Sequence, residues 1–441
     1  MYVSIDDTDS LDGNCTTFLI TEIIDEFRDL DLIGYPRLVR LNPAVPWKTR
    51  GNGSLSIELG KGIGAKRHIG MIAGRDIFCF EEMAETDIDE MEILKRIIPL
   101  VERYHEDSAD PGVIVSKRRP SDSFYWSGVR TIVDINEVRA EIERINAKTF
   151  GIGCERGLIG ALCGMAWEPG DSTLELLTYR KKEKWGTERE YDPLSIREAD
   201  MSTCLTFNSW EERTRKVTMV PSTPCPVMYG FRGEDEWELL YGLETIKTEP
   251  LDRWMIFLTN QGTDDHIILD AEEMVLESSY YVEGKVRSSA RHEKGGHVFF
   301  DIDSKYGCIT VGVYEPSKDF RHVPEELSPG DVIGVMGEMR KDPRTLNAEK
   351  IKVISVVDRI EKISNPICEK CSRTMGSAGK DKGYRCRDCH TSSSEPVVKR
   401  APSYLIPGWY EPPESSRRHL SKPLKRMGEE QPVMFVNSRM Q

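Results

Sequence analysis

Four cysteines near the end of the chain constrain its folding more tightly than any other feature of the sequence. Cys368 and Cys371 form one Cys-x-x-Cys pair, and fourteen residues later Cys386 and Cys389 form a second. Two pairs at this spacing are typical of a zinc ribbon, whereas a redox motif needs only one. Four thiolates give zinc a closed tetrahedral shell, which is structural and leaves no open position for catalysis. We therefore predict a structural Zn²⁺ site, with His390 as a competing ligand for Cys389.

At the other end of the chain, a short predicted strand runs directly into three carboxylates. Residues 2–5 alternate in hydropathy, and Asp6, Asp7 and Asp9 follow at once. Residues 16–27 then have apolar positions at the spacing of an amphipathic helix. Three acids this close repel one another unless a cation lies among them, and oxygen ligands favour Mg²⁺ completed by substrate phosphates. A solvated acidic turn is the alternative interpretation.

Two nearby segments indicate phosphate binding. Residues 15–17 (Cys-Thr-Thr) open the predicted helix, where backbone N–H groups favour an anion. Further on, Lys48 and Arg50 lie beside a glycine-rich turn, in which Gly51 and Gly53 allow the backbone to approach a phosphate closely. The segment lacks the Gly-Lys-Ser/Thr arrangement of a P-loop. Together with the acids, these residues predict a nucleotide-dependent site.

The order of predicted elements makes this a multidomain α/β and α+β protein. Helix and strand patterns alternate in the first part of the chain. The next part has the order helix-strand-strand and then strand-helix-strand, as in a split βαβ unit. Five predicted strands with a helical insert follow, and they fit a β-barrel. An OB-fold barrel most often binds single-stranded nucleic acid or oligosaccharide. The expected parts are a kinase-like α/β domain (1–145), a ferredoxin-like domain (146–265), an OB-fold (266–360), a zinc ribbon (361–400) and a basic, partly disordered tail (401–441).

Three finer expectations concern the first two domains. Residues 81–98 have the periodicity of a helix that buries Met91 and ends or kinks at Pro99. Asp110 precedes a predicted strand and is a weaker candidate for the acidic site, a plain turn being the alternative. The glycine-rich segment 155–162 is expected to allow tight helix–sheet packing rather than to bind a ligand.

Composition and charge limit where the protein works and what it binds. The first residues show neither the basic stretch nor the apolar stretch of a secretory signal. No apolar run in the sequence approaches the ~20 residues that are needed to span a bilayer. Its other cysteines have no framework spacing, so we expect a reduced, cytoplasmic protein. The net charge is −14, but residues 366–441 carry +6 and the preceding residues −20. A basic terminal module can supply phosphate contacts that an acidic body does not.

Five segments together resemble the archaeal agmatidine synthetases that modify the minor isoleucine tRNA. The resemblance covers nearly the whole chain and includes the domain order, with Asn14 and Cys154 as the departures inside the motifs. The segments are IDDTDSLDGNCTT, NPAVPWKTRGNG, GCERGLIGALCGMAW, TPCPVMYGFRGE and RWMIFLTNQGTDDH. The resemblance implies an ATP-dependent ligase that joins agmatine to the wobble cytidine of the CAU anticodon.

The resemblance also implies roles for residues and partners. Asp6, Asp7 and Asp9 match the acids that bind Mg²⁺ and ATP, and Thr16 matches an autophosphorylated threonine, with Thr17 the alternative. The expected partners are isoleucine tRNA and agmatine, without a membrane or an obligate protein partner. Agmatine is expected between the first two domains, where Arg232 and Glu234 are candidate lining residues unless they are ordinary surface residues.

Two other functions fit parts of the sequence. A non-enzymatic single-strand-binding factor explains the OB-fold and the ribbon but gives the acids no role. An ATP-dependent ligase acting on a small amine without RNA leaves the ribbon and the basic tail unexplained.

Overall fold

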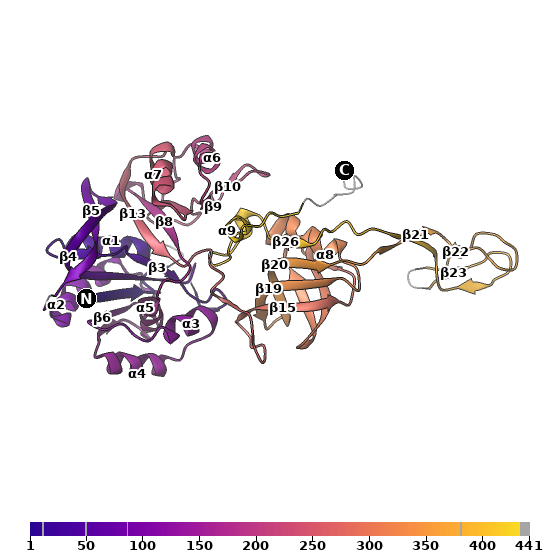
Figure 1. Cartoon of the computed structure of the whole chain (residues 1–441), viewed down its shortest axis with the longest axis horizontal. Helices are drawn as coiled ribbons and strands as arrows, with labels where there is room; N and C mark the ends of the chain where they lie inside the picture. Colours follow the sequence, from indigo (N-terminus) through magenta and orange to yellow (C-terminus); the bar gives the residue numbers. More distant parts are fainter. Residues whose placement is uncertain (11–12, 49–50, 86, 380–381, 433–441) are drawn as a thin grey trace.

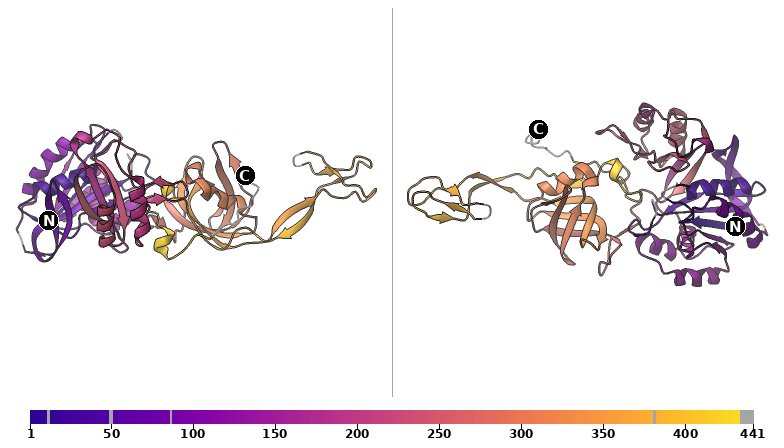
Figure 2. Two further views of the ribbon diagram at one scale, coloured as in Figure 1. Left: turned by 90° about the horizontal axis from the view of Figure 1, so that it is seen from above. Right: turned by 180° about the vertical axis from the view of Figure 1, so that it is seen from behind.

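The protein is elongated, with a large N-terminal body, a barrel beside it and a thin arm that ends in the zinc ribbon (Figure 1). The computed structural model describes residues 1–432 except 11–12, 49–50, 86 and 380–381. The views from above and behind show the same order of parts (Figure 2). The described residues contain no helix that is both long and apolar enough to cross a membrane.

The first domain is built on a mainly antiparallel sheet, and the side chains of its central strands alternate between two cores. Val113 and Val115 pack with helices α1 and α2, whereas Ile114 packs with α3, α4 and α5 on the other face. The elements are β1 Tyr2–Asp6, α1 Thr16–Glu26, β2 Asp31–Ile33, β3 Arg37–Arg40, β4 Gly53–Ile72, β5 Arg75–Ala84, α2 Glu90–Tyr104, β6 Gly112–Ser116, α3 Ser123–Arg130, α4 Ile135–Ile145, β7 Lys148–Gly151 and α5 Gly157–Ala166.

The second domain continues the same sheet. The described strands run in the order β7-β6-β1-β4-β3-β13-β8-β12-β9, and β13 joins the two halves by pairing with β3, β4 and β8. Helices α6 and α7 cover the outer half through a core that includes Ile196 and Leu239. The elements are β8 Thr173–Arg180, η1 Lys182–Lys184, α6 Pro193–Ser202, β9 Thr206–Phe207, β10 Trp210–Glu211, β11 Lys216–Val217, β12 Val227–Gly233, α7 Glu236–Thr245 and β13 Leu251–Thr259.

The third domain is a closed five-stranded barrel. Strands β15, β19, β20, β18 and β17 pair in that cyclic order, β18 and β20 being parallel, with the helical insert between β18 and β19 as in an OB-fold. The elements are β14 Ile267–Ile268, β15 Ser279–Val286, β16 Arg291–Glu293, β17 His297–Ser304, β18 Gly307–Val313, η2 Glu315–Arg321, α8 His322–Glu326, β19 Val332–Arg340 and β20 Thr345–Ser355.

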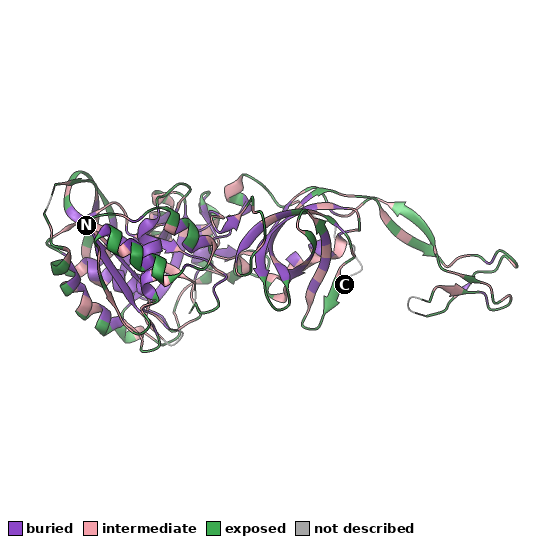
Figure 3. Cartoon of the chain, turned by 90° about the horizontal axis from the view of Figure 1, so that it is seen from below, coloured by how far each residue is buried: buried purple, intermediate pink, exposed green. Residues whose placement is uncertain are grey.

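A two-stranded arm leads from the barrel to the ribbon, and the chain then returns. Strands β21 and β25 form the arm, most of which is exposed (Figure 3). After the arm the chain passes along the barrel, where β26 pairs with β20, and reaches the first two domains before α9. It then turns back, so that Gln431 accepts from the Glu411 N–H beside the barrel. The elements are β21 Arg359–Ser364, β22 Gly376–Ser377, β23 Tyr384–Arg385, β24 Ser392–Ser393, β25 Val397–Ala401, β26 Gly408–Tyr410, η3 Glu414–Ser416 and α9 Leu424–Met427.

The fold class predicted from the sequence is confirmed, with two corrections. Residues 81–84 end strand β5, and helix α2 begins only at Glu90, continues through Pro99 and leaves Met91 exposed. The expectation of a partly disordered tail is wrong for residues 402–432. We call residues 404–427 the return segment, because they pack along the barrel and bury Leu420 in the core of the first domain.

Candidate active site and zinc site

The three acids lie at the end of β1, where antiparallel pairing brings a second loop beside them. Asp6 pairs with Gly112, so the residues that precede β6 lie next to the acids. Asp7 has a φ of 56°, in the left-handed region, and its backbone N–H donates to Asp6 Oδ1 at 2.7 Å. Such a conformation costs about 1–3 kcal/mol in a residue other than glycine and is common at functional sites. The backbone strain therefore supports a functional role for this turn.

The electrostatics of the acids are those of a site that needs a cation. Burial raises the pKa of Asp6 to about 8, and repulsion from Asp7 adds to the shift. Burial also raises the pKa of Asp7, with further contributions from Asp110 and Asp9. Among the described residues these carboxylates do not close into a compact ligand set. That geometry fits Mg²⁺, which takes one or two carboxylates and completes its shell with water and phosphate oxygens.

Helix α5 fixes the position of Asp6 by packing directly on it. A Cβ atom at Gly160 would lie only 1.6 Å from Asp6 Oδ2, and one at Gly164 would lie 2.4 Å from Ser54 Oγ. Gly157 similarly allows the helix to approach the backbone of Gly112. The expected tight packing is present at all three glycines, and Gly160 also lines the cavity that contains the acids.

The two threonines open α1 with their hydroxyls in the same cavity as the acids. Thr8 Oγ1 donates to Thr16 Oγ1 at 3.0 Å, and Thr17 Oγ1 lies 3.0 Å from Cys15 Sγ. The Thr17 carbonyl accepts from the Tyr179 hydroxyl at 3.0 Å, which ties the helix start to the second domain. Both hydroxyls thus remain candidates for the phosphorylated residue.

A cavity of about 140 Å³ joins these groups to the glycine-rich loop predicted to bind ATP. Lys48, Gly51 and Gly53 line it opposite the acids. Arg50 lies outside the described residues. A Cβ at Gly51 would lie 2.9 Å from Arg40 Nη1, so glycine lets the loop and the guanidinium approach closely. The structure thus brings the predicted loop and the acids to one cavity.

Two further cations line this cavity that the sequence did not single out. Arg40, at the end of β3, donates from Nη1 to the Gly51 carbonyl at 3.0 Å. Arg156, just before α5, lies over the Trp47 ring at 5.1 Å and lowers the pKa of Asp7, although burial raises it more. Arg156 lies in the segment GCERGLIGALCGMAW, and Arg40 lies just before the segment NPAVPWKTRGNG. Only the tertiary fold shows that they meet the acids.

The candidate agmatine residues have other partners. Arg232 Nε donates to the buried carboxylate of Glu175 at 2.8 Å. Glu234 pairs with Arg426 of the return segment at 2.5 Å. Neither residue lines the cavity that contains the acids. Arg232 therefore makes a core-stabilising contact, and Glu234 makes a contact between domains.

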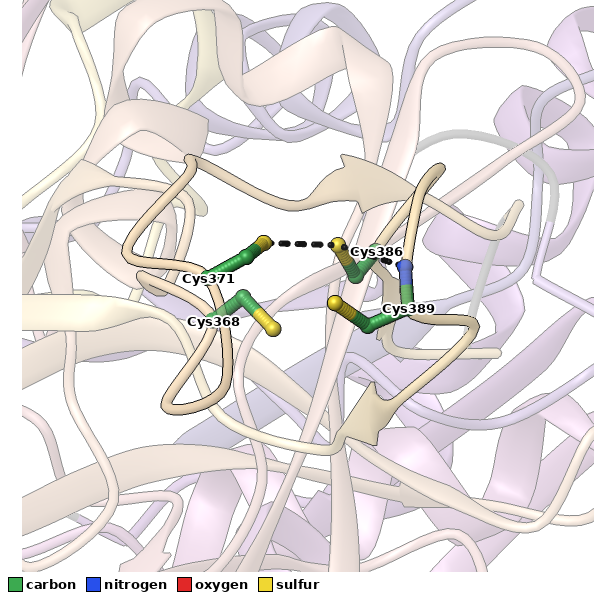
Figure 4. A group of neighbouring side chains, drawn as sticks. All are labelled: Cys368, Cys371, Cys386 and Cys389. Carbon is green, nitrogen blue, oxygen red and sulfur yellow. Dashed lines mark hydrogen bonds between the residues drawn. The ribbon is translucent and has the colours of Figure 1, made fainter.

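The zinc site is formed as the cysteine spacing predicts. Atoms Sγ of Cys368, Cys371, Cys386 and Cys389 all lie within 4.8 Å of one another (Figure 4). The Cys371 and Cys386 sulfurs are 3.6 Å apart. A tetrahedron with Zn–S bonds of about 2.3 Å has sulfurs about 3.8 Å apart. The donor set and its spacing fit a closed structural Zn²⁺ site.

A cavity lined by carboxylates, threonines and cations, an OB-fold barrel and a four-cysteine zinc ribbon are together the parts expected of an enzyme that acts on nucleic acid. Comparison with known families agrees, because the TiaS TCKD domain matches residues 2–154 and the TiaS FLD domain residues 155–266. An OB-fold nucleic acid binding domain matches residues 280–354, and the TiaS C-terminal zinc ribbon domain matches residues 365–402. The chain belongs to the TiaS family.

Individual relatives extend over the full length. The isoleucine tRNA 2-agmatinylcytidine synthetase TiaS of Archaeoglobus fulgidus is 39% identical, covering 98% of both chains. A crystal structure of TiaS in complex with its isoleucine tRNA and ATP superposes with a TM-score of 0.82 at 38% identity, over 98% of this chain and 99% of that one. A complex of TiaS with the same tRNA, AMPCPP and agmatine gives 0.80 at 35% identity over the same shares.

Proposed function

We propose that this protein uses ATP to attach agmatine to the 2-carbon of the wobble cytidine in the CAU anticodon of isoleucine tRNA. The modified base would pair with A and so decode AUA. The observation that carries the proposal is the 39% identity over 98% of both chains with a 2-agmatinylcytidine synthetase, across all the domains. The cavity with the acids, the threonines and the basic loop supplies the matching chemistry.

The reaction follows from the poor leaving ability of the cytosine 2-oxo group. Transfer of a phosphoryl group from ATP to that oxygen breaks a phosphoanhydride bond of ATP, forms an O–P bond and makes phosphate the leaving group. The primary amine of agmatine then attacks the 2-carbon, the bond from that carbon to the oxygen breaks, and phosphate departs with the oxygen while the amine loses a proton. Extruding the base from an anticodon loop is inexpensive because it is already unpaired.

The residues of this cavity act mainly by positioning and by offsetting charge, as in other phosphoryl transfers. Asp6, Asp7 and Asp9 would hold Mg²⁺, which would offset the negative charge of the phosphates. Lys48 and Arg40 face the acids across the cavity and bind phosphate oxygens. Thr16 is the proposed autophosphorylated residue, since its hydroxyl accepts from Thr8 and keeps its own proton for transfer.

The remaining parts support the same function. The barrel and the ribbon are the proposed contacts to tRNA, and the ribbon binds Zn²⁺. We place the protein in the cytoplasm, where its tRNA substrate is found. The non-enzymatic single-strand-binding alternative is not favoured, because the TiaS TCKD domain match spans the acidic cavity that such a factor would not need.

Mass spectrometry of the tRNA product tests the proposal. Isoleucine tRNA with a CAU anticodon, incubated with the protein, ATP and agmatine, should gain the mass of agmatine less one water at the wobble nucleotide. Reactions without agmatine, or with a GAU anticodon, serve as controls. An unmodified CAU tRNA in the complete reaction would refute the function.

Thr16→Val and Thr17→Val separate the two threonines. Each change removes a hydroxyl and keeps the side-chain shape, so the fold should persist. After incubation with ATP, the phosphorylated peptide should disappear only in Thr16→Val. Loss in Thr17→Val alone would transfer the role to Thr17.

A further inference from the structure

A second cavity, of about 210 Å³, lies on the other side of the glycine-rich loop. It shares Arg40, Lys48 and Gly51 with the first cavity, so the two adjoin. Its other wall is formed by Arg418 and His419 of the return segment. Unlike the first cavity, its lining contains no acidic residue among those described. Leu41, Pro43 and Leu420 complete the lining, so the charged groups of the cavity are all cations, which favours an anion.

Two of its cations lack a carboxylate partner among the described residues. Arg40 donates from Nη1 to the Gly51 carbonyl, and its buried Nε has no hydrogen-bond partner. Lys48 forms no ion pair in the described part of the chain. Arg418 differs, because it pairs with Glu338 and, at 3.3 Å, with Glu349. A buried donor left without a partner costs about 1–3 kcal/mol, so Arg40 gains most from an added acceptor.

His419 is held in place by its backbone while its side chain is left to the cavity. Its carbonyl accepts from the Gly262 N–H at 2.8 Å, and the carbonyl of Leu420 accepts from Asp264 N–H at 2.8 Å. Leu420 itself is only 2% exposed. The imidazole makes no hydrogen bond within the described residues. A Cβ atom at Gly51 would lie 3.0 Å from Cδ2 of the ring, so the lack of a side chain at Gly51 leaves room for the imidazole.

The electrostatic surroundings of this imidazole also favour an anion. The Arg40 guanidinium lowers the pKa of His419 well below its usual value, and desolvation and Arg232 add to the shift although the residue as a whole remains exposed. The ring is therefore neutral near pH 7 and offers an N–H to a ligand. An anion among these groups would offset the repulsion that produces the shift.

We propose that Arg40, Lys48 and His419 form a phosphate-binding subsite beside the reaction centre, completed by the return segment. The inference rests on the proposed function, which brings two sources of phosphate to this place. One is the RNA backbone next to the extruded cytidine, and the other is the nucleotide. At about 210 Å³ the cavity admits a phosphate with its ester linkages.

The test uses the full-length protein and His419→Ala, which leaves the backbone contacts of the return segment in place. Dissociation constants are measured for tRNA without ATP over a series of salt concentrations, and for ATP without tRNA. We expect one of the two to weaken about tenfold, as for loss of a charge-assisted hydrogen bond. If tRNA is affected while its log–log salt slope is unchanged, as expected for loss of a neutral N–H donor, the site belongs to the RNA backbone. If ATP is affected, the site belongs to the nucleotide.

Two further variants make the result specific. His419→Gln keeps an N–H donor and should remain within about threefold of wild type. Lys95→Gln removes a cation from the exposed face of α2, away from both cavities, and should change neither constant. Unchanged binding of both ligands in His419→Ala, or an equal loss in Lys95→Gln, would overturn the subsite. Whether the wild-type protein modifies tRNA is measured separately and tests the proposed function. The subsite and the proposed function can therefore fail independently of each other.

Discussion

Replacing Gly160 with alanine should move Asp6 and slow the reaction without unfolding the protein. The added Cβ would lie 1.6 Å from Asp6 Oδ2, and an ordinary contact begins near 3.4 Å, so the carboxylate must move by 1.8 Å. The displaced group is a side chain, whereas α5 is buried against strands and hydrophobic neighbours and moves less readily. A displacement of about 1 Å at a reacting centre can cost about 100-fold in rate. We therefore expect at least that loss in the rate of tRNA modification.

The effect on stability should be smaller. Alanine favours a helix over glycine by about 1 kcal/mol, and overpacking costs about 1–3 kcal/mol, so the net loss is about 0–2 kcal/mol. Gly164→Ala is the matched control, because it crowds the same helix against Ser54 and does not touch Asp6. Single-turnover mass spectrometry and thermal denaturation measure both quantities. A near wild-type rate in Gly160→Ala, or an equal rate loss in Gly164→Ala, would refute the positioning argument.

Three further changes test other parts of the chain. Asp7→Asn should abolish nucleotide chemistry with the fold intact, because it removes charge from a proposed Mg²⁺ ligand; near wild-type tRNA modification would mean that the acids are a solvated turn. Cys371→Ser should release the zinc and unfold only the ribbon, so zinc analysis should show loss of the metal while ATP turnover persists. Loss of ATP turnover together with the zinc would indicate that the ribbon contacts the catalytic domain directly. Leu420→Ala should cost about 2–5 kcal/mol at its buried site and raise hydrogen exchange in the return segment, whereas unchanged exchange there would show that this side chain is not its anchor.

Features with local periodicity or fixed spacing could be predicted from the sequence. The strand that leads into Asp6 and the helix from Thr16 were predicted within one or two residues of β1 and α1. Barrel strands such as β17 at His297–Ser304 also alternate in hydropathy, which is the pattern that predicted a barrel. The four cysteines meet because their knuckles are short. In each case the information lies within one element and needs no knowledge of its partners.

Features that depend on distant pairing could not be predicted in this way. Residues 81–84 have helical composition, but they form the end of β5 because that strand completes a long hairpin with β4. Tertiary pairing outweighs local preference there. Arg40 and His419 come from opposite ends of the chain and meet only because the return segment crosses to the first domain. No local pattern marks either residue as part of a site.

The structure also shows what the basic residues of the return segment contact. Its cations pair with acids instead of remaining free for RNA: Lys422 and Arg426 pair with Asp171 of the N-terminal body at 2.8 and 2.7 Å, and Arg417 pairs with Glu411 of the same segment at 2.8 Å. Charges already paired release few counterions when RNA binds, so they contribute little to the salt dependence of affinity. The unpaired excess of residues 366–441 therefore lies mainly in the ribbon and its arm. Electrostatic binding of tRNA should depend on that module, while the return segment serves to join the barrel to the catalytic cavity.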